Sequence, residues 1–290
     1  MFILKNNMRK IIILLALVFI GIECNAQWTL IQKNSTFPKI YANNNFVFMS
    51  IEKPNDGSQY GMYDIFVSEN NGDSFTLTIS PNYSQYDIFF VGDDIYAKAA
   101  VSGYYKYMNG GMNWEFLKDV SYMTPAGKIL NIPDEITDYE FPEIIEINGK
   151  IYIATFNNGV FYSDDNGKTF RSSNLNEFIF KFFTNGNNIY ACSSNGLYIS
   201  KNNGETWNKK NLGLTCNEPC NYGDIISFNG NIIVSFGDEV YLSKDDCNNW
   251  IDFSEGLSNL SEVNTGGFFA VNNKYIFYAY EGGIYRRSLK

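Results

Sequence analysis

Ser163-Asp-Asp165-Asn-Gly167-Lys-Thr-Phe170 is the clearest copy of a phrase that decides the fold of this chain. The phrase combines a small or polar start, an Asp or Asn, a turn and an aromatic residue at fixed offsets. Its Asp or Asn side chain accepts backbone N–H bonds across the turn, and its Gly adopts the positive φ angle that other residues avoid. Each copy therefore predicts a tight turn between two strands.

Four further copies follow the same offsets and begin at Ser68, Tyr107, Ser200 and Ser243. Two of them depart from the phrase, because Tyr107 replaces the leading Ser and Cys247 replaces the Gly. The residues to which we assign a structural role in these turns are Ser68, Asn70, Gly72, Asn109, Gly111, Ser163, Asp165, Gly167, Ser200, Asn202, Gly204, Ser243 and Asp245. Turn chemistry of this kind specifies architecture and does not name a ligand.

The spacing of the phrases indicates the architecture. Their closing aromatic residues lie 39, 56, 37 and 43 residues apart, at Phe75, Trp114, Phe170, Trp207 and Trp250. Between them, short apolar strands alternate with Gly-containing turns, which is typical of antiparallel hairpins. A period of this length fits one four-stranded antiparallel blade per repeat, so we expect an all-β fold, the β-propeller.

Six blades fit the chain best. A sixth unit starts at Phe268, but the chain stops at Lys290 before its last strand, and the segment that follows Trp28 resembles the missing strand. We expect this N-terminal strand at Trp28 to close the ring, because an unpaired terminal strand would leave an edge able to recruit other chains. Seven blades are the alternative if residues 118–142 contain another blade.

The phrase resembles the Asp-box, also called the BNR repeat, whose pattern is Ser-x-Asp-x-Gly-x-Thr followed by Trp or Phe. The resemblance covers essentially the whole chain after residue 26 and implies an Asp-box β-propeller. Such propellers include sialidases, xyloglucan-cleaving glycosidases, sortilin-type receptors and the photosystem II assembly factor. In this family the motif marks the hairpin between the third and outermost strands of a blade, on the rim opposite the ligand face.

The sequence lacks the catalytic set of the sialidases. Sialidases bind the substrate carboxylate with three converging arginines, whereas the arginines after residue 26 are Arg171, Arg286 and Arg287. Arg286 and Arg287 are adjacent, so strand alternation sends their side chains to opposite faces. The nearest match to the Arg-Ile-Pro motif of sialidases is Asn131-Ile-Pro133, which has no Arg.

We predict no catalytic residues, no cofactor and no metal site. The chain contains no His, which excludes Ser-His-Asp and Cys-His arrangements within it. A glycoside hydrolase with a pair of carboxylates is the alternative, although the sequence singles out no such pair. The favoured interpretation is an exported, non-catalytic propeller that binds a protein or a glycan on one face of a rigid ring.

Three irregular segments are expected on the ligand face, at residues 52–61, 118–142 and 216–222. The tyrosines and acids of residues 118–142 suit a basic or sugar-containing partner, although an ordinary solvated loop explains this segment equally well. Including one aromatic residue outside these segments, the candidate partner-binding residues are Tyr60, Tyr122, Asp134, Asp138, Tyr139 and Phe156.

The first 26 residues have the pattern of a secretory signal peptide. Basic residues precede an apolar run from Ile11 to Ile22, and small residues that suit cleavage follow up to Ala26. A lipoprotein modified at Cys24 is the less favoured alternative. We expect residues 27–290 to form a single propeller domain that is monomeric and either secreted or periplasmic.

Charge and cysteine content limit the partners. The whole chain has a net charge of −9, and removal of residues 1–26 leaves 19 basic against 30 acidic residues, a net charge of −11. An acidic surface argues against nucleic acid and anionic membranes, and no segment after residue 26 is apolar enough for membrane insertion. Four cysteines follow residue 26; we favour a disulfide between Cys216 and Cys220, with free thiols as the alternative.

Overall fold

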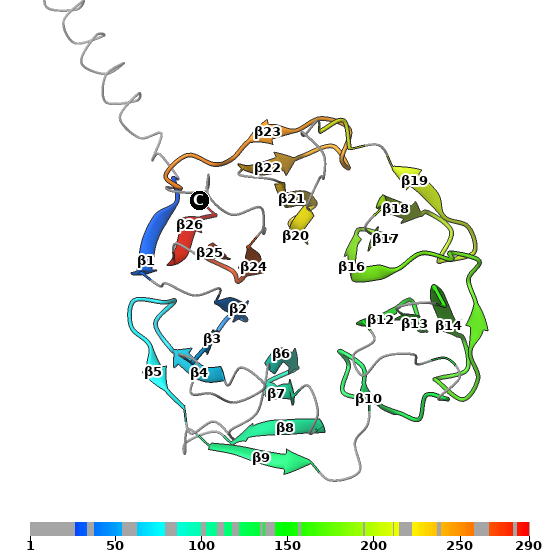
Figure 1. Cartoon of the computed structure of the whole chain (residues 1–290), viewed down its shortest axis with the longest axis horizontal. Helices are drawn as coiled ribbons and strands as arrows, with labels where there is room; N and C mark the ends of the chain where they lie inside the picture. The colour runs from blue at the N-terminus through cyan, green and yellow to red at the C-terminus, as the bar shows by residue number, and fades with distance from the viewer. Residues whose placement is uncertain are drawn as a thin grey trace, which may run out of the picture.

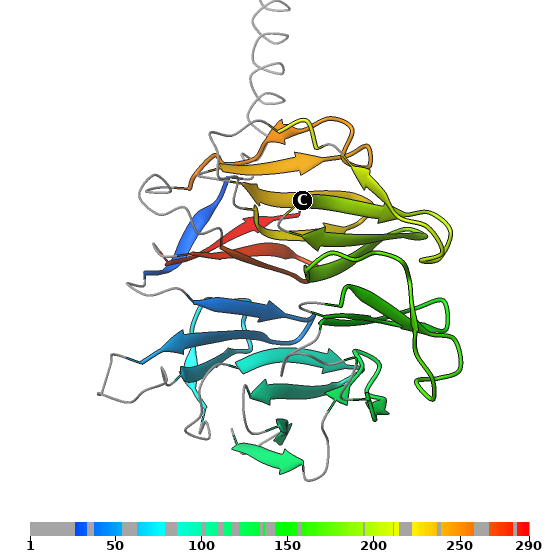
Figure 2. The same ribbon diagram turned by 45° about the vertical axis from the view of Figure 1, so that its right-hand side comes forward.

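Six four-stranded antiparallel sheets surround a central axis and form the blades of a β-propeller (Figure 1). This computed structural model describes residues 27–33, 38–53, 63–78, 86–99, 103–108, 113–117, 122–133, 136, 143–155, 158–193, 195–210, 212–214, 222–236, 239–257, 267–280 and 283–289. In each blade the first strand lies at the axis and the last lies outermost (Figure 1; Figure 2). The prediction of an all-β propeller with six blades is confirmed.

The first three blades follow one another directly from the axis outwards. Blade 1 contains β2 (Lys39–Ala42), β3 (Val47–Glu52), β4 (Tyr63–Ser68) and β5 (Thr76–Leu77). Blade 2 contains β6 (Tyr86–Val91), β7 (Asp94–Ala99), β8 (Gly103–Met108) and β9 (Asn113–Leu117). Blade 3 contains β12 (Glu143–Ile147), β13 (Lys150–Ala154), β14 (Val160–Ser163) and β15 (Arg171–Ser172).

The last three blades include the one that is shared between the two ends of the chain. Blade 4 contains β16 (Ile179–Asn185), β17 (Asn188–Ser193), β18 (Gly196–Ser200) and β19 (Asn208–Lys210). Blade 5 contains β20 (Tyr222–Phe228), β21 (Asn231–Phe236), β22 (Glu239–Ser243) and β23 (Ile251–Asp252). Blade 6 contains β24 (Phe268–Val271), β25 (Tyr275–Tyr280), β26 (Gly283–Ser288) and, as its outermost strand, β1 (Thr29–Lys33).

The N-terminal strand closes the ring as predicted. Strand β1 pairs with β26 in antiparallel register, from Thr29 opposite Arg286 to Lys33 opposite Gly283. The preceding residue, Trp28, is 2% exposed, and its indole N–H donates to the Phe253 carbonyl of blade 5 at 2.7 Å. The two chain ends are therefore held in one sheet, which leaves no unpaired terminal strand in this blade.

The closing tryptophans of the phrases in blades 2 and 5 dock these blades on the preceding ones. The indole N–H of Trp114 in blade 2 donates to Thr78 Oγ1 of blade 1 at 3.2 Å. The indole N–H of Trp250 in blade 5 donates to the carbonyl of Leu212, which follows blade 4, at 2.7 Å. These residues belong to apolar clusters that are each built from two neighbouring blades. The core is thus a ring of interfaces between blades.

The segment between blades 2 and 3 contributes a short hairpin. Strands β10 (Tyr122–Met123) and β11 (Ile129–Leu130) pair only with each other. On one side Leu130 packs with Ile151 of blade 3, and on the other the backbone N–H of Met123 donates to Tyr104 Oη of blade 2 at 3.0 Å. The described part of residues 118–142 therefore fills the seam between two blades and forms no seventh blade.

Two sequence predictions concern residues that the structure does not describe. The signal peptide at residues 1–26 and the Cys216–Cys220 disulfide lie outside the described residues. Cys192 and Cys247 are described, and both are buried free thiols. No helix within the described ranges is long and apolar enough to cross a membrane.

Candidate functional site

The Asp-box turns use their polar groups internally. In blade 3, Ser163 Oγ accepts a hydrogen bond from the backbone N–H of Gly167 at 2.7 Å and donates to Asp165 Oδ1 at 2.8 Å. The carboxylate of Asp165 also accepts bonds from the hydroxyl and the backbone N–H of Thr169. These hydrogen bonds, that of the Thr169 hydroxyl first, hold the pKa of Asp165 well below its usual range. Such turns serve the scaffold.

The same arrangement recurs in the other described turns. Ser68, Ser200 and Ser243 each bond the residue two positions on and the backbone N–H four positions on. The turns lie between the third and fourth strands of their blades. The predicted turn residues Asn109 and Gly111 of blade 2 lie outside the described residues.

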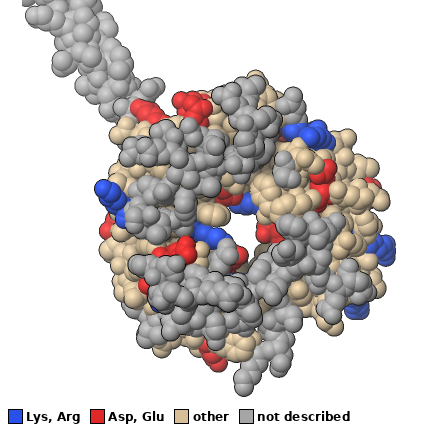
Figure 3. All heavy atoms as spheres, in the orientation of Figure 1, with Lys and Arg blue, Asp and Glu red and all other residues tan. Residues whose placement is uncertain are grey.

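At the opposite end of the strands, a cavity of about 450 Å³ opens on the propeller axis. Basic and acidic atoms surround the central opening in the space-filling view (Figure 3). The cavity, which we call the axial mouth, is lined at the start of the innermost strand of every blade. One residue from each blade stands at this level: Lys39, Asp87, Glu143, Lys181, Asp224 and Phe268.

These six residues are structurally equivalent. Each lies five residues before the two-residue turn that joins the first and second strands of its blade. In the sheets, Lys39 stands opposite Ser50, Glu143 opposite Ala154 and Phe268 opposite Ala279, five residues beyond the turn. Strand positions that face a protein interior are normally apolar. Five charged residues in six equivalent positions therefore mark the mouth as the candidate functional site.

Two ion pairs bridge neighbouring blades in the mouth. Lys39 Nζ of blade 1 lies 2.6 Å from Asp87 Oδ1 of blade 2, and the Tyr41 hydroxyl donates to the same oxygen at 3.0 Å. The Asp87 side chain is 53% exposed, so this carboxylate is open to a ligand. Burial, and then the negative charge of Asp87, raise the pKa of Tyr41, which keeps its hydroxyl protonated.

The second pair joins Lys181 of blade 4 to Asp224 of blade 5. The Asp224 side chain is 6% exposed and also accepts the backbone N–H groups of Ile225 and of Phe269 in blade 6, both at 2.8 Å. Burial, the largest single effect, lowers the pKa of Lys181, but the charge and hydrogen bond of Asp224 together with the charges of Glu143 and Cys192 outweigh it and raise that pKa. Asp224 thereby links three blades and fixes the position of Lys181.

Glu143 is the carboxyl group of the mouth with the most perturbed environment. Burial raises the pKa of Glu143 to about 7, against the attraction of the Lys181 charge. The charges of Asp87 and Asp224 raise it further, whereas a hydrogen bond from the backbone N–H of Phe182 lowers it. Near neutral pH, Glu143 therefore exists in both protonated and ionised forms.

Aromatic and apolar side chains complete the walls. Phe180 and Phe268 are 36% and 37% exposed at the mouth, and Lys39 Nζ lies 5.5 Å from the centre of the Phe268 ring. Between blades 2 and 3 the wall includes Met123 and Pro125 of the inserted hairpin. A cavity that combines apolar walls and exposed rings with a few fixed polar groups has the composition of a ligand site.

The predicted partner-binding residues are placed as follows. Tyr122 is half-buried beneath Lys98, whose Nζ lies 5.6 Å from its ring centre, and it packs with the hairpin core without lining the mouth. The other candidates lie outside the described residues: Tyr60, Asp134, Asp138, Tyr139 and Phe156. The charged ring at the strand starts is not among the residues predicted from the sequence, although each member lies five residues before the first hairpin turn of its blade.

The arginines stay away from the mouth. Arg286 donates to the Asn71 carbonyl at 2.8 Å, whereas Arg287 donates to the Phe253 carbonyl at 3.1 Å. Arg171 lies on the outermost strand of blade 3, beside Asp164. Arg286 and Arg287 therefore lie at two different blade interfaces and Arg171 on the outer surface of blade 3, so the three guanidinium groups do not form the converging set of a sialidase.

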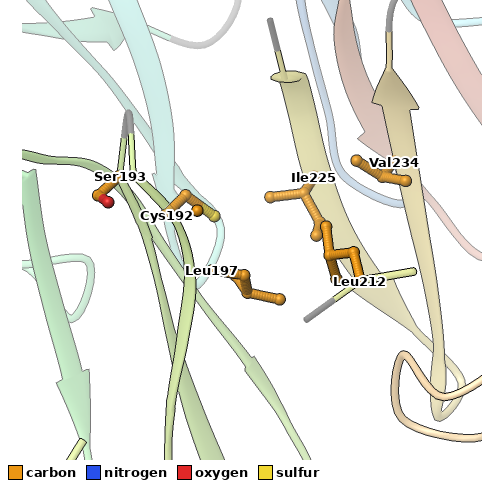
Figure 4. A pocket seen from close by; sticks show the side chains of 7 residues that line it. Cys192, Ser193, Leu197, Leu212, Ile225 and Val234 are labelled. Atoms are coloured by element: carbon orange, nitrogen blue, oxygen red, sulfur yellow. The ribbon is translucent and has the colours of Figure 1, made fainter. Parts of the chain in front are cut away.

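A second, much smaller cavity lies between blades 4 and 5 (Figure 4). It holds about 10 Å³, and its lining includes Cys192, Leu197, Leu212, Ile225 and Val234. Burial raises the pKa of the Cys192 thiol, which therefore stays protonated and unreactive. This cavity is a packing gap in the core.

Within the described ranges, no group of three or more acidic or Cys residues is arranged to hold a metal ion.

Comparison with known proteins agrees with the turn geometry. The family model described as BNR/Asp-box repeat matches residues 198–209, which contain the blade 4 turn. The chain is a six-bladed β-propeller that carries Asp-box turns. No curated protein is significantly similar to it in sequence.

Solved structures of low sequence identity share this fold. An α-L-arabinanase of Penicillium chrysogenum, solved with arabinobiose, is 11% identical with a TM-score of 0.54, and the match covers 91% of this chain and 98% of that one. The extracellular domain of a protein described as a one-component system of B. thetaiotaomicron is 12% identical with a TM-score of 0.53 over 90% of this chain.

The match to the extracellular domain covers 40% of that solved chain, so the propeller described here spans less than half of the solved chain's length. YCF48 from Cyanidioschyzon merolae is 11% identical with a TM-score of 0.49, and the match covers 90% of this chain and 98% of that one. The similar structures thus include both enzymes and proteins described otherwise. At such identities the likeness concerns the fold alone.

Proposed function

We propose that this Asp-box propeller is an exported, non-catalytic module that binds a neutral glycan at the axial mouth. The observation that carries the proposal is the pairing of charges between neighbouring blades in the mouth. Lys39 bonds Asp87 and Lys181 bonds Asp224, so the ring presents fixed donors and acceptors with little net charge. Such groups suit the hydroxyls of an uncharged sugar better than an ionic ligand, for which unpaired charges of one sign are needed.

The exposed rings support the same ligand class. Phe180 and Phe268 flank the blade that carries Asp224, and both offer apolar faces beside the polar ring. The apolar C–H face of a sugar can cover an aromatic ring while its hydroxyls bond the charged groups. The mouth has no guanidinium group among its described lining residues, which argues against a carboxylated sugar.

Calorimetric titration of the purified protein tests the proposal. Cellohexaose, xylohexaose, arabinohexaose and chitohexaose represent neutral glycans, and hexagalacturonate represents an anionic one. We expect at least one neutral hexasaccharide to bind, and Phe268→Ala to weaken that binding at least tenfold. Phe116→Ala is the matched control, because Phe116 is 47% exposed on the outermost strand of blade 2. If every neutral sugar fails to bind, or if both variants bind equally, the proposal is wrong.

A glycoside hydrolase is the second candidate, favoured by the state of Glu143. A general acid must hold its proton at the working pH, and burial raises the pKa of Glu143 to about 7. Asp87 on the neighbouring blade supplies a half-exposed carboxylate. Release of new reducing ends from the same hexasaccharides, abolished by Glu143→Gln, would favour this candidate; binding without turnover favours the module.

A further inference from the structure

Glu143 is surrounded by charges that are already committed to other partners. It begins β12 at the wall of the mouth, to which the inserted hairpin contributes Met123 and Pro125. Among the described residues, the groups whose charges act on it from other elements are Lys181 on β16, Cys192 on β17, Asp224 on β20 and Asp87 on β6. Lys181 is the cation of this set, but it is ion-paired with Asp224.

The hydrogen bonds of Glu143 leave room for a ligand. The backbone N–H of Phe182 donates to its carboxyl group. Glu143 is half-buried in the wall of the mouth, and a carboxylate accepts up to four hydrogen bonds, so part of its hydrogen-bonding capacity faces the cavity. Two further carboxylates of the same ring, Asp87 and Asp224, repel its ionised form. A proton on Glu143 removes this repulsion and converts one of its oxygens into a donor.

We propose that Glu143 binds the ligand as a neutral carboxylic acid that donates a hydrogen bond to a ligand oxygen, so that ionisation of Glu143 releases the ligand. This inference rests on the proposed function and specifies its chemistry. The matching ligand atom is an acceptor, such as a ring, glycosidic or hydroxyl oxygen. An ammonium group on the ligand would need the ionised form and would show the opposite pH dependence.

Binding measured against pH tests the inference. The probe is the neutral hexasaccharide of the panel that binds most tightly at pH 6, titrated into wild type, Glu143→Gln and Glu115→Gln. Only the protonated fraction of Glu143 is competent, so the dissociation constant of wild type should rise about 30-fold between pH 6 and pH 8.5. Gln keeps an N–H donor and does not ionise, so Glu143→Gln should bind equally at both pH values. Glu115 is exposed on β9, and its variant should follow wild type.

The outcomes separate this inference from the function on which it rests. If no hexasaccharide binds at pH 6, the glycan-binding function fails, and the inference with it. If a sugar binds wild type equally at both pH values, or if Glu143→Gln shows the same loss as wild type, only the inference is overturned. Should Glu143→Gln not fold, the carbon-13 shift of the wild-type Glu143 carboxyl decides, because the bound sugar must raise its pKa.

Discussion

The Asp-box rim and the axial mouth occupy opposite ends of the same strands and use the repeat in opposite ways. On the rim, Ser163 and its equivalents make the same hydrogen bonds in each described turn. At the mouth, equivalent positions carry Lys, Asp, Glu or Phe according to the blade. The repetition of one residue pattern builds the scaffold, and the differences among equivalent positions create the site.

The largest test of this division is Asp224→Ala, because Asp224 lies in the mouth and yet links blades 4, 5 and 6. Its loss leaves Lys181 without its carboxylate and two backbone N–H groups without an acceptor. We expect a loss of about 4 kcal/mol in the free energy of unfolding, measured by urea denaturation. Asp87→Ala, at a half-exposed pair, should cost about 1 kcal/mol or less. An equal loss of stability in the two variants would show that Asp224 does not hold the three blades together.

The rim is tested by adding a methyl group at Gly204. This residue has a φ of +76°, and a Cβ there would lie 2.4 Å from Cε1 of Tyr152 in the preceding blade. The control is Gly230→Ala, since Gly230 has the same φ of +76° in a hairpin turn with no atom within 4 Å of the added Cβ. Gly230→Ala should cost about 1 kcal/mol from its backbone alone.

Gly204→Ala should cost about 3 kcal/mol, because overpacking adds to the same backbone strain. Urea denaturation of both variants measures the difference. An equal loss in the free energy of unfolding of the two variants would mean that the Gly204 turn does not pack tightly against the neighbouring blade.

The pH dependence of stability examines the mouth without a ligand. Burial raises the pKa of Glu143 from 4.5 to about 7, so between these values the folded state binds more protons than the unfolded state. Wild type should therefore lose stability relative to Glu143→Gln as the pH rises from about 4.5 to about 7, and the difference should then level off at about 3 kcal/mol at most. Unfolding at pH 5 and pH 8 measures it, and a constant difference would contradict the raised pKa of Glu143.

The same contrast explains what the sequence could predict. The hydrogen bonds of each turn span at most four residues, so the phrase around Asp165 predicts its own geometry. The ion pairs of the mouth join residues 48 and 43 positions apart, Lys39 to Asp87 and Lys181 to Asp224. Such pairs become visible only when the ring brings separate blades together. Closure by Trp28 was predictable because one strand was missing from a counted repeat.

The loops and the charged ring differ in how visible they are in the sequence. Irregular segments stand out against a repeat, whereas Glu143 and Asp224 lie inside strands that otherwise look like apolar hairpins. Their positions are regular and only their chemistry is unusual. Alignment of the repeats by their first hairpin turns, beginning from Asn148-Gly149 and Asn229-Gly230, would have exposed these charges.

The smallest effect is expected at the interface between blades 3 and 4, which differs from the interface between blades 1 and 2 in the hydrogen bond of its tryptophan. Thr78 Oγ1 accepts from the Trp114 indole at 3.2 Å and donates to the Ile65 carbonyl at 2.8 Å. At the equivalent interface, Ser173 Oγ and Trp207 Nε1 are both buried without a hydrogen-bond partner among the described residues.

The backbone bonds of Ser173 and Thr78 match, since each N–H donates to the carbonyl of the third strand at 2.8 Å. Thr restricts χ1 more than Ser does, so Ser173→Thr should fix the hydroxyl where the indole can reach it. One hydrogen bond recovered in the core adds about 0.5–1 kcal/mol to the free energy of unfolding, measurable as a rise in Tm. The gain should vanish in a Trp207→Phe background; a gain of the same size there would assign it to the added methyl group.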